Sequence, residues 1–437
     1  MPKKKTALTI EERLQQALVP AEEQPYEVPE NWVWVRLGAI AEIVTGGTPS
    51  KKHPEYYGGN FPFYKPSDLD QGRLTYDASE YLSEEGKNVS RIIPKNSTAV
   101  CCIGSIGKCG YLMCEGTTNQ QINSAIPKIN SLCLYYYLCT ENFVQDLLSM
   151  ASATTIAIVN KSKMESCAFP LPPLSEQQRI VERIEELFAK LDEAKERLQE
   201  VADSFAVRKA AILHKAFTGE LTKQWRRENG VSDESWEEKK LSEITENQDS
   251  KRIPLSKSQR DNMNRIYDYY GASGIIDKVD DYIFEGKKLL IGEDGANLVT
   301  RSKDIAFIAD GKYWVNNHAH ILDVKDTVLL MYLCNYINNM DLIPYVTGSA
   351  QPKLTQAKMN NIKIFLPTLP EQHEIVRLID DLLARERAAQ QAAEQALASI
   401  DLMKKSILAR AFRGELGTNK ASEASALELL KQVLAEN

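Results

Sequence analysis

The chain has 437 residues, of which 43% are hydrophobic and 26% charged, with a formal net charge of −7. This composition is typical of a globular protein of two or three domains and excludes a fibrous or disordered chain. No run of about 18 apolar residues exists, and the basic start Lys3-Lys4-Lys5, a solvated tail, precedes no apolar segment, so we predict no membrane span and no secretory signal. The eight cysteines lack CxxC spacing, which favours buried free thiols and a cytoplasmic protein.

An internal repeat divides the chain. The run Leu171–Gln177 recurs as Leu366–Gln372, displaced by 195 residues, and Ala216–Leu221 recurs as Ala411–Leu416 at the same displacement. A second repeat, displaced by 204, sets Trp32 beside Trp236. The sequence therefore predicts two copies of one unit, a globular domain followed by a long helix. In chain order we expect a helical extension (1–24), domain 1 (25–171), helix 1 (172–221), a linker (222–235), domain 2 (236–366), helix 2 (367–416) and a helical tail (417–437).

Both domains read as mixed α/β folds. Short apolar runs such as 99–104, 121–127, 288–292, 304–308 and 318–324 predict strands, and 132–150 and 327–340 predict helices. The fold class is therefore α+β, with a twisted sheet and long irregular loops in each copy.

Each long helix carries apolar residues at alternating spacings of four and three, the pattern of a heptad seam, with Arg208 and Glu386 as polar exceptions. Ser175 suits the N-cap of helix 1, and Gly219 suits its end. Because domain 2 enters helix 2 through a short Pro-rich link, we expect the helices to form an antiparallel two-helix coiled coil with a pseudo-twofold repeat; independent helices or intermolecular coils are the alternative. The predicted seam comprises Ile180, Ile184, Leu187, Leu191, Leu198, Val201, Phe205, Ile212, Ile375, Ile379, Leu382, Ala389, Ala393, Ala396, Ile400, Met403 and Ile407.

The polar loops are candidates for contact with DNA. Asn and Gln read adenine, Lys and Arg read guanine or neutralise phosphate, and Gly lets backbone amides approach a phosphate. The same residue types also dominate ordinary turns. Both domains are nearly neutral in charge, which leaves DNA binding open, because the electrostatic field is local. The candidates are Thr45, Gly46, Gly47, Thr48, Ser50, Lys51, Lys52, Lys65, Ser67, Ser105, Lys108, Asn119, Gln120, Gln121, Asn123, Tyr270, Ser273, Asn297, Arg301, Asn316, Asn317, His318, His320, Ser349, Gln351 and Lys353.

The loops differ between the copies although the helices match. This combination predicts two different ligands held by one scaffold, and on DNA it predicts a bipartite site with two unlike halves.

Several motifs together resemble the specificity (S) subunit of type I restriction–modification enzymes. They are Gly46–Ser50 with Lys65–Leu69, Leu290–Asn297 with Trp314–Ala319, and the repeated Pro173–Gln177 and Gly219–Leu221. The resemblance covers nearly the whole chain. It implies one target-recognition domain per DNA half-site, a helical ruler between them, and docking of two methyltransferase (M) and two restriction (R) subunits. It also implies that this chain is not catalytic and binds no cofactor, so that AdoMet, ATP and Mg²⁺ are used by the partners.

Other functions have weaker support. An adenine methyltransferase needs an Asn-Pro-Pro-aromatic or Asp-Pro-Pro-aromatic motif, which is absent, and the glycines of 104–110 lack a strand–turn–helix context. His318 and His320 have no evident third metal ligand, and no Lys follows Glu293-Asp294 at nuclease spacing. A non-DNA scaffold with two ligand-binding domains and a solitary S-like protein remain alternatives. The amphipathic segments 11–18 and 427–434 resemble each other, and we expect them to bring the two ends of the chain together.

Overall fold

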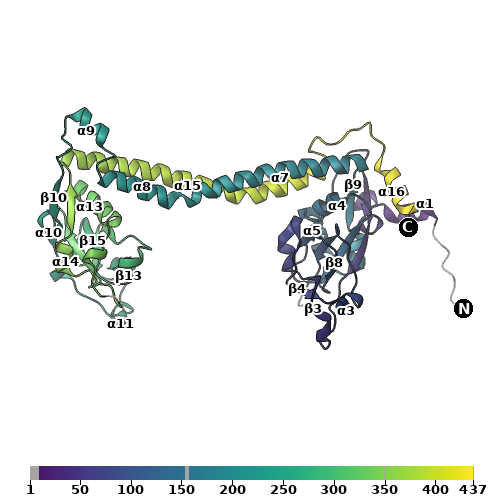
Figure 1. Cartoon of the computed structure of the whole chain (residues 1–437), viewed down its shortest axis with the longest axis horizontal. Coiled ribbons are helices and arrows are strands. Elements are labelled where there is room, and N and C mark those ends of the chain that lie inside the picture. Colours follow the sequence, from purple (N-terminus) through teal and green to yellow (C-terminus); the bar gives the residue numbers. More distant parts are fainter. Residues whose placement is uncertain (1–8, 153–156, 349, 437) are drawn as a thin grey trace. The chain divides into compact units, whose positions relative to one another are not determined.

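The computed structural model describes residues 9–152, 157–348 and 350–436 (Figure 1). The tail Lys3-Lys4-Lys5 lies outside the described residues. The chain divides into two compact units: unit 1 contains the residues up to Arg197 together with those from Ala396 onward, and unit 2 contains Leu198–Gln395. Each unit combines small sheets with helices, which confirms the predicted α+β class. No helix in these described ranges is long and apolar enough to cross a bilayer.

Domain 1, in unit 1, is built on three sheets. A four-stranded antiparallel sheet has the order β2-β8-β5-β6, a second sheet has the order β4-β3-β7 with β3 parallel to β7, and β1 pairs with β9. The strands are β1 (Val33–Arg36), β2 (Ala41–Thr45), β3 (Tyr57–Tyr64), β4 (Glu80–Leu82), β5 (Thr98–Cys101), β6 (Cys109–Tyr111), β7 (Thr117–Thr118), β8 (Ile122–Pro127) and β9 (Ala168–Leu171).

Domain 2, in unit 2, repeats the three sheets. The order β11-β18-β15-β16 matches the four-stranded sheet of domain 1, β13-β12-β17-β14 contains the corresponding parallel pair β12–β17, and β10 pairs with β19. The strands are β10 (Glu237–Lys240), β11 (Glu246–Asn247), β12 (Tyr267–Gly271), β13 (Gly274–Val279), β14 (Phe284–Glu285), β15 (Lys288–Gly292), β16 (Ala306–Ala309), β17 (Lys312–Val315), β18 (Ala319–Asp323) and β19 (Lys363–Leu366). The internal repeat in the sequence is therefore a repeat of topology.

The helices surround these sheets or form the long segments. In unit 1 and at the unit boundary they are α1 (Ile10–Ala17), α2 (Leu37–Ile40), α3 (Glu84–Asn88), α4 (Ser131–Leu138), α5 (Glu141–Ser149), α6 (Lys161–Ser166), α7 (Leu174–Asp203) and α16 (Ala426–Ala435). In unit 2 they are α8 (Phe205–Phe217), α9 (Lys223–Asn229), α10 (Leu241–Ile244), α11 (Lys257–Arg260), α12 (Asn297–Thr300), α13 (Thr327–Asn339) and α14 (Gln356–Asn360), with α15 (Leu369–Ala411) extending into unit 1.

Three predictions about helix boundaries were wrong. The predicted helix 132–150 is two helices, because Thr140 caps a new helix by accepting a hydrogen bond from the backbone N–H of Phe143 at 3.3 Å. Helix 1 is α7 followed by α8, with Ser204 between them. Ser175 is not an N-cap, because α7 already begins at Leu174 behind Pro173. The predicted end of helix 1 at Gly219 agrees with its positive φ of 76°.

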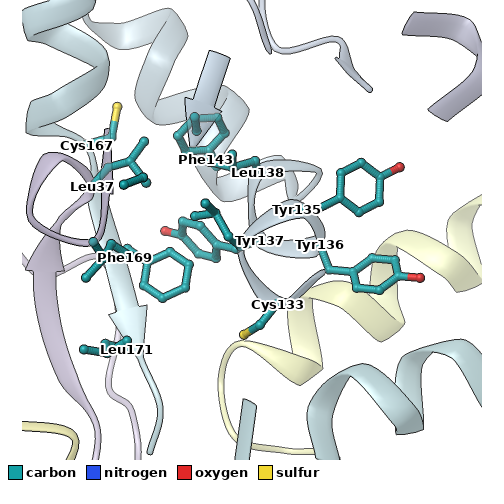
Figure 2. Close-up of a cluster of buried hydrophobic side chains, with 14 of the residues drawn as sticks. Leu37, Cys133, Tyr135, Tyr136, Tyr137, Leu138, Phe143, Cys167, Phe169 and Leu171 are labelled. Carbon is teal, nitrogen blue, oxygen red and sulfur yellow. The ribbon is translucent and has the colours of Figure 1, made fainter. Parts of the chain in front are cut away.

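A buried aromatic cluster attaches the end of α15 to domain 1. The ring of Tyr137 on α4 lies 5.1 Å from Phe412 and 4.8 Å from Phe169, between centroids, and Figure 2 shows Tyr137 beside Phe169. All three side chains are fully or almost fully buried. In unit 2, Phe217 at the end of α8 contacts Tyr332 at 5.4 Å. The displacement of 195 relates Phe217 to Phe412 and Tyr137 to Tyr332, so each domain binds the end of a long helix in the same way.

Within each unit the long helices pack side by side and run in opposite directions (Figure 1). In unit 1, Lys404 on α15 pairs with Asp192 on α7 at 2.5 Å, while Phe412, later in the chain, belongs to the same buried core as Ile180, earlier on α7. In unit 2, Arg208 on α8 pairs with Glu386 on α15. The two-helix packing predicted from the heptads is therefore present.

The predicted seam follows the buried face only in part. Val201, Ala389 and Met403 are exposed, the first by 38% and the last by 49% of their surface. The reason is that a straight helix of 3.6 residues per turn drifts away from a strict seven-residue repeat. Leu383 and Leu408, neighbours of predicted positions, are buried instead. The remaining predicted seam residues are buried or half-buried: Ile180, Ile184, Leu187, Leu191, Leu198, Phe205, Ile212, Ile375, Ile379, Leu382, Ala393, Ala396, Ile400 and Ile407.

The two ends of the described chain meet in unit 1. Helices α1 and α16 pack against each other, and Arg13 donates a hydrogen bond to the carbonyl oxygen of Leu434 at 3.2 Å. Ala17 and Leu430 belong to one buried core. The predicted proximity of these amphipathic segments is confirmed.

Candidate nucleic-acid interface

A network of backbone and side-chain hydrogen bonds joins three segments of domain 1. The Oδ1 atom of Asn119 accepts the backbone N–H of Gln121 at 3.0 Å, and the carbonyl of Gln121 accepts the N–H of Cys102 at 2.7 Å. The carbonyl of Cys102 accepts the N–H of Val159 at 2.9 Å. The side-chain amide of Asn123 then donates to the carbonyl of Val159 at 3.4 Å. We call these five residues polar corner 1.

Domain 2 repeats the network bond for bond. Asn316 Oδ1 accepts the N–H of His318 at 2.8 Å, the carbonyl of His318 accepts the N–H of Glu293 at 2.8 Å, and the carbonyl of Glu293 accepts the N–H of Leu354 at 2.7 Å. His320 Nε2 lies 2.7 Å from the carbonyl oxygen of Leu354. These five residues are polar corner 2. The duplicated framework therefore keeps an asparagine at its first position and has Asn123 in one copy and His320 in the other at its last.

The two corners differ most in charge. In corner 1 the hydroxyl of Thr45 donates to Asn123 Oδ1 at 2.7 Å, a neutral contact. In corner 2, Nδ1 of the buried His320 lies 2.5 Å from Asp249 Oδ2. Because both ring nitrogens of His320 face acceptors, only the doubly protonated imidazolium donates to both.

Basic groups surround the acids of corner 2. Arg252 donates to Glu293 at 2.8 Å, and Lys353 pairs with Glu293 at 3.2 Å. Burial is the largest single influence on Asp249 and raises its pKa. The hydrogen bond and charge of His320, the hydrogen bond from the backbone N–H of Ile321 and the charge of Arg252 together outweigh burial, so the pKa lies below its ordinary value. At Glu293, burial again raises the pKa, while the hydrogen bond from Arg252 and the nearby positive charges lower it. The pKa of Glu293 is lowered on balance. Corner 2 is thus a charged, partly buried network.

The turns that begin at the buried residues Asn119 and Asn316 carry exposed polar side chains. Gln120 and Asn317 are exposed at matching positions, and Gln120 Oε1 accepts a hydrogen bond from the Thr48 hydroxyl at 2.5 Å. The half-exposed His318 pairs through Nδ1 with Asp294 at 2.8 Å, which leaves Nε2 outside that contact.

Basic side chains lie at the loops of domain 1. Lys51 and Lys52 are exposed, and Arg91, also exposed, donates to the carbonyl oxygen of Thr45 at 2.5 Å. Arg91 could not be predicted from the sequence, because it lies far along the chain from Thr45 and outside a Gly-rich or Asn-rich loop. Of the other predicted lysines, Lys65 pairs with Glu80 at 2.8 Å and Lys108 with Asp70 at 2.7 Å, so each is held by a carboxylate.

Several of the predicted DNA-contact residues are engaged within the protein. Tyr270 is buried, and its ring packs against Phe307 and Tyr313, so it is not available to a base. Arg301 donates to carbonyls at the C-terminal end of α13, including that of Met340, where a cation satisfies unpaired helix carbonyls, and burial lowers its pKa. Asn297 holds its own loop through hydrogen bonds with Ser302 and Lys303.

Four of the predicted DNA-contact residues are buried in the corners. Asn119, Asn123, Asn316 and His320 were predicted to contact DNA, but each is less than a tenth exposed and is engaged in the corner hydrogen bonds. Polar side chains at strand ends satisfy the buried backbone here, and the sequence does not distinguish this role from base reading.

The predicted glycines have two different roles. A Cβ atom on Gly46 would lie 2.2 Å from the carbonyl oxygen of Asn119, so this glycine permits close packing of two loops rather than contact with a phosphate. Gly47 has open space around its Cα. Ser349 lies outside the described residues. The remaining predicted polar residues of these loops are exposed: Ser50, Ser67, Ser105, Ser273 and Gln351.

Within the described ranges, no three His, Cys, Asp or Glu side chains are grouped so as to hold a metal ion. His318 and His320 belong to adjacent hydrogen-bonded contacts, with Asp294 and Asp249 respectively.

Comparison with known proteins identifies the architecture. The family model of the type I restriction modification DNA specificity domain matches residues 29–203 and 233–396. The chain is 40% identical over 147 residues to the putative specificity subunit S.HindORF215P of Haemophilus influenzae, covering 37% of that relative. It is 35% identical to the EcoR124I/EcoR124II specificity subunit of Escherichia coli over 39% of that relative. It is 23% identical to the EcoKI specificity subunit of Escherichia coli, where the alignment spans 94% of this chain and 96% of the relative.

The solved structures agree on the fold. The HsdS subunit of Thermoanaerobacter tengcongensis superposes with a TM-score of 0.64 at 18% identity, covering 90% of this chain and 99% of that chain.

The chain thus shares its architecture of duplicated domains and paired helices with specificity subunits of type I restriction–modification systems. The chain belongs to the type I restriction–modification DNA specificity family, whose members are the specificity subunits of these systems. The family carries no cofactor of its own.

Proposed function

We propose that the chain reads a bipartite double-stranded DNA site, with each target-recognition domain reading one half-site through the loops at its polar corner. The observation that carries this proposal is the repeat of four hydrogen bonds around Asn119 and Asn316 with different exposed residues, Gln120 and Asn317, following them. One framework that presents different hydrogen-bonding groups suits two unlike base sequences. The long helices then act as the spacer between the half-sites, and the protein acts in the cytoplasm.

The same proposal includes assembly. Exposed apolar side chains recur at the displacement of 195: Leu174 and Leu369 are 56% and 47% exposed, and Val207 and Leu402 are 71% and 66% exposed. Equivalent apolar positions on both copies support binding of two copies of one partner. We assign these partners as two methyltransferase subunits, with two restriction subunits added to them. AdoMet, ATP and Mg²⁺ are used by those subunits.

Methylated-adenine mapping in the host genome tests recognition. A strain with the wild-type gene is expected to show one bipartite methylated motif, and deletion of the gene to abolish it. Exchange of residues 236–366 for those of another specificity subunit is expected to change one half-site alone. A wild-type genome without such a motif, or a motif that survives deletion, would contradict the proposed function.

A binding measurement distinguishes the rival non-DNA scaffold. Binding to duplex DNA is expected to weaken steeply with salt because phosphate contacts release counterions. Binding that does not depend on salt, or no binding, favours the scaffold.

Co-purification from the host tests the partners. The wild-type chain is expected to retain a methyltransferase, and Val207→Asp or Leu402→Asp to reduce its amount, whereas Gln199→Ala on the exposed surface of α7 serves as the matched control. Recovery of the wild-type chain without a methyltransferase would indicate a solitary S-like protein.

A further inference from the structure

Each polar corner contains a buried asparagine and, directly after it in the chain, two more exposed polar residues. Asn119 and Asn316 are 7% and 5% exposed, and each uses its side chain to fold the backbone that follows. The two residues after each asparagine stand at the outer side of this turn: Gln120 and Asn317 are exposed, Gln121 is half-buried and His318 is exposed. The turn therefore presents two adjacent polar side chains in each domain.

In both domains, a backbone hydrogen bond to a buried tyrosine fixes the residue at which the turn begins. The N–H of Asn119 donates to the carbonyl of Tyr64 at 3.1 Å, and that of Asn316 donates to the carbonyl of Tyr270 at 3.0 Å. Both tyrosines are buried. Because this anchor lies in the core of each domain, the turn is held by the fold and not by the exposed loops.

The backbone leaving each turn is fixed by a buried side chain. Asn123 and His320 stand four residues after the turn asparagines and donate to equivalent carbonyls, those of Val159 and Leu354. They are 3% and 1% exposed, so both side chains are engaged inside the domain and not presented at its surface. Each ties the strand that follows the turn to the loop that closes the corner.

The exposed side chains are partly oriented before any ligand binds. The hydroxyl of Thr48 donates to Oε1 of Gln120, so the Nε2 amide group of Gln120 takes no part in that hydrogen bond. The carboxylate of Asp294 forms a hydrogen bond with Nδ1 of His318, and Nε2 of the same ring takes no part in that hydrogen bond. Held in this way, an amide or an imidazole loses less conformational freedom when it reads the edge of a base pair.

We propose that Gln120–Gln121 and Asn317–His318 are the equivalent specificity-determining pairs of the two half-sites, and that Asn123 and His320 are the positioning residues that fix them. This inference rests on the proposed function and deepens it. The ligand of each pair is the hydrogen-bonding edge of bases in the major groove. His320 performs with an imidazole ring held by Asp249 what Asn123 performs with an amide held by Thr45.

Methylated-adenine mapping of host strains that carry single variants of the full chain tests the proposal. Gln120→Ala and Gln121→Ala are expected to reduce discrimination about tenfold at one or two base pairs of one half-site, and Asn317→Ala and His318→Ala to do so in the other half-site. Gln199→Ala, on the exposed surface of α7, is expected to leave both half-sites unchanged. The amount of soluble chain is matched between strains.

Positioning is tested separately. His320→Ala is expected to lower methylation at all sites about tenfold with the same preferred bases, whereas His320→Asn, which installs the side chain used at position 123, is expected to recover most of it. If the methylation level of the His320→Asn strain is no higher than that of the His320→Ala strain, His320 is not a positioning residue.

The outcomes separate the inference from the function on which it rests. The assigned pairs are wrong, and the proposed function stands, if the wild-type strain shows a bipartite motif that all four alanine variants of the assigned pairs retain. The same holds if one of these variants alters both half-sites at normal protein level. If the wild-type strain shows no motif, the proposed function itself fails.

Discussion

The guanidinium of Arg208 on α8 donates through Nε to the carboxylate of Glu386 on α15 at 2.5 Å. These residues are the polar exceptions in two otherwise apolar heptad seams. Their side chains are 33% and 25% exposed, so the pair is partly shielded from water. A polar pair at one position of an apolar seam fixes register, because any other alignment leaves each charge facing apolar side chains.

Loss of one partner of this pair is expected to destabilise unit 2 more than loss of both. Glu386→Ala leaves Arg208 unpaired and is expected to cost about 1 kcal/mol, whereas the double variant Arg208→Leu with Glu386→Leu is expected to be at least as stable as the wild type. Chemical denaturation followed by circular dichroism measures the difference. Arg385→Ala, which removes a well-exposed pair with Asp381, is the control with little expected effect. A double variant less stable than Glu386→Ala would show that the charges themselves stabilise the helices.

The glutamate of the repeated Glu-Gln motif, Glu176 in unit 1 and Glu371 in unit 2, is expected to stabilise each unit through buried hydrogen bonds. In unit 1 the carboxylate of Glu176 accepts hydrogen bonds from Trp32 at 2.7 Å, Asn419 at 2.9 Å and Thr418 at 3.2 Å. Glu176→Ala removes the acceptor of the buried donors of Trp32 and Thr418 and is expected to cost about 2–4 kcal/mol, measured by chemical denaturation.

Two variants control this experiment. Glu182→Ala changes an exposed carboxylate on the same helix and is expected to have almost no effect. Glu371→Ala removes the equivalent carboxylate of unit 2, which accepts from Thr222 and Arg226, both at 2.7 Å, and is expected to destabilise comparably. Full stability of Glu176→Ala would show that the motif has no structural role and serves a partner.

The overall architecture could be predicted because it is encoded in repeated local patterns. The displacement of 195 residues identified both helices, and the apolar spacing at Ile180 and Ile184 identified the buried face of α7. The same spacing misplaced Val201 and Met403, because a sequence pattern does not reveal the gradual rotation of a helix around its partner. Register over a long helix depends on packing that is absent from the local sequence.

The candidate interface was predicted less well. Composition alone drew attention to the segment 118–123 and its counterpart around Asn316. It also assigned Asn123, His320, Tyr270 and Arg301 to DNA, and all four are used inside the protein. Buried donors and exposed readers are made of the same residue types, and only the three-dimensional hydrogen bonds separate them. Arg91 was missed because its contact with Thr45 is distant in sequence.

The aromatic contacts at the helix ends are expected to hold each domain to its long helix. Phe412 is fully buried against Tyr137 and Phe169, so Phe412→Ala is expected to cost about 3–5 kcal/mol through loss of burial and formation of a cavity. Thermal unfolding measures the effect. Leu402→Ala, on the exposed surface of the same helix, is expected to change stability by less than about 0.5 kcal/mol. Equal effects of the two variants would contradict the anchoring role of Phe412.

Acid is expected to open polar corner 2 before polar corner 1. The pKa of Asp249 and that of Glu293 are lowered in the folded protein, so both carboxylates bind protons more weakly there than in the unfolded chain. Their contribution to stability is present above the unfolded pKa values of about 3.9 and 4.3, and is lost as the pH falls through the lower folded values. His320, Arg252 and Lys353 face these carboxylates and are cationic in acid, so protonation of the acids leaves positive charges close together.

Corner 1 is the internal control, because Thr45 and Asn123 hold it without a carboxylate. Hydrogen exchange measured by mass spectrometry between about pH 6 and pH 3, corrected for the intrinsic pH dependence of exchange, is expected to show loss of protection in residues 317–323 and retention in residues 120–127. The variant Asp249→Asn with His320→Asn replaces the charged contact by a neutral one and is expected to reduce the difference between the corners. Equal loss of protection in both corners of the wild-type chain would show that the charged network does not govern the acid response.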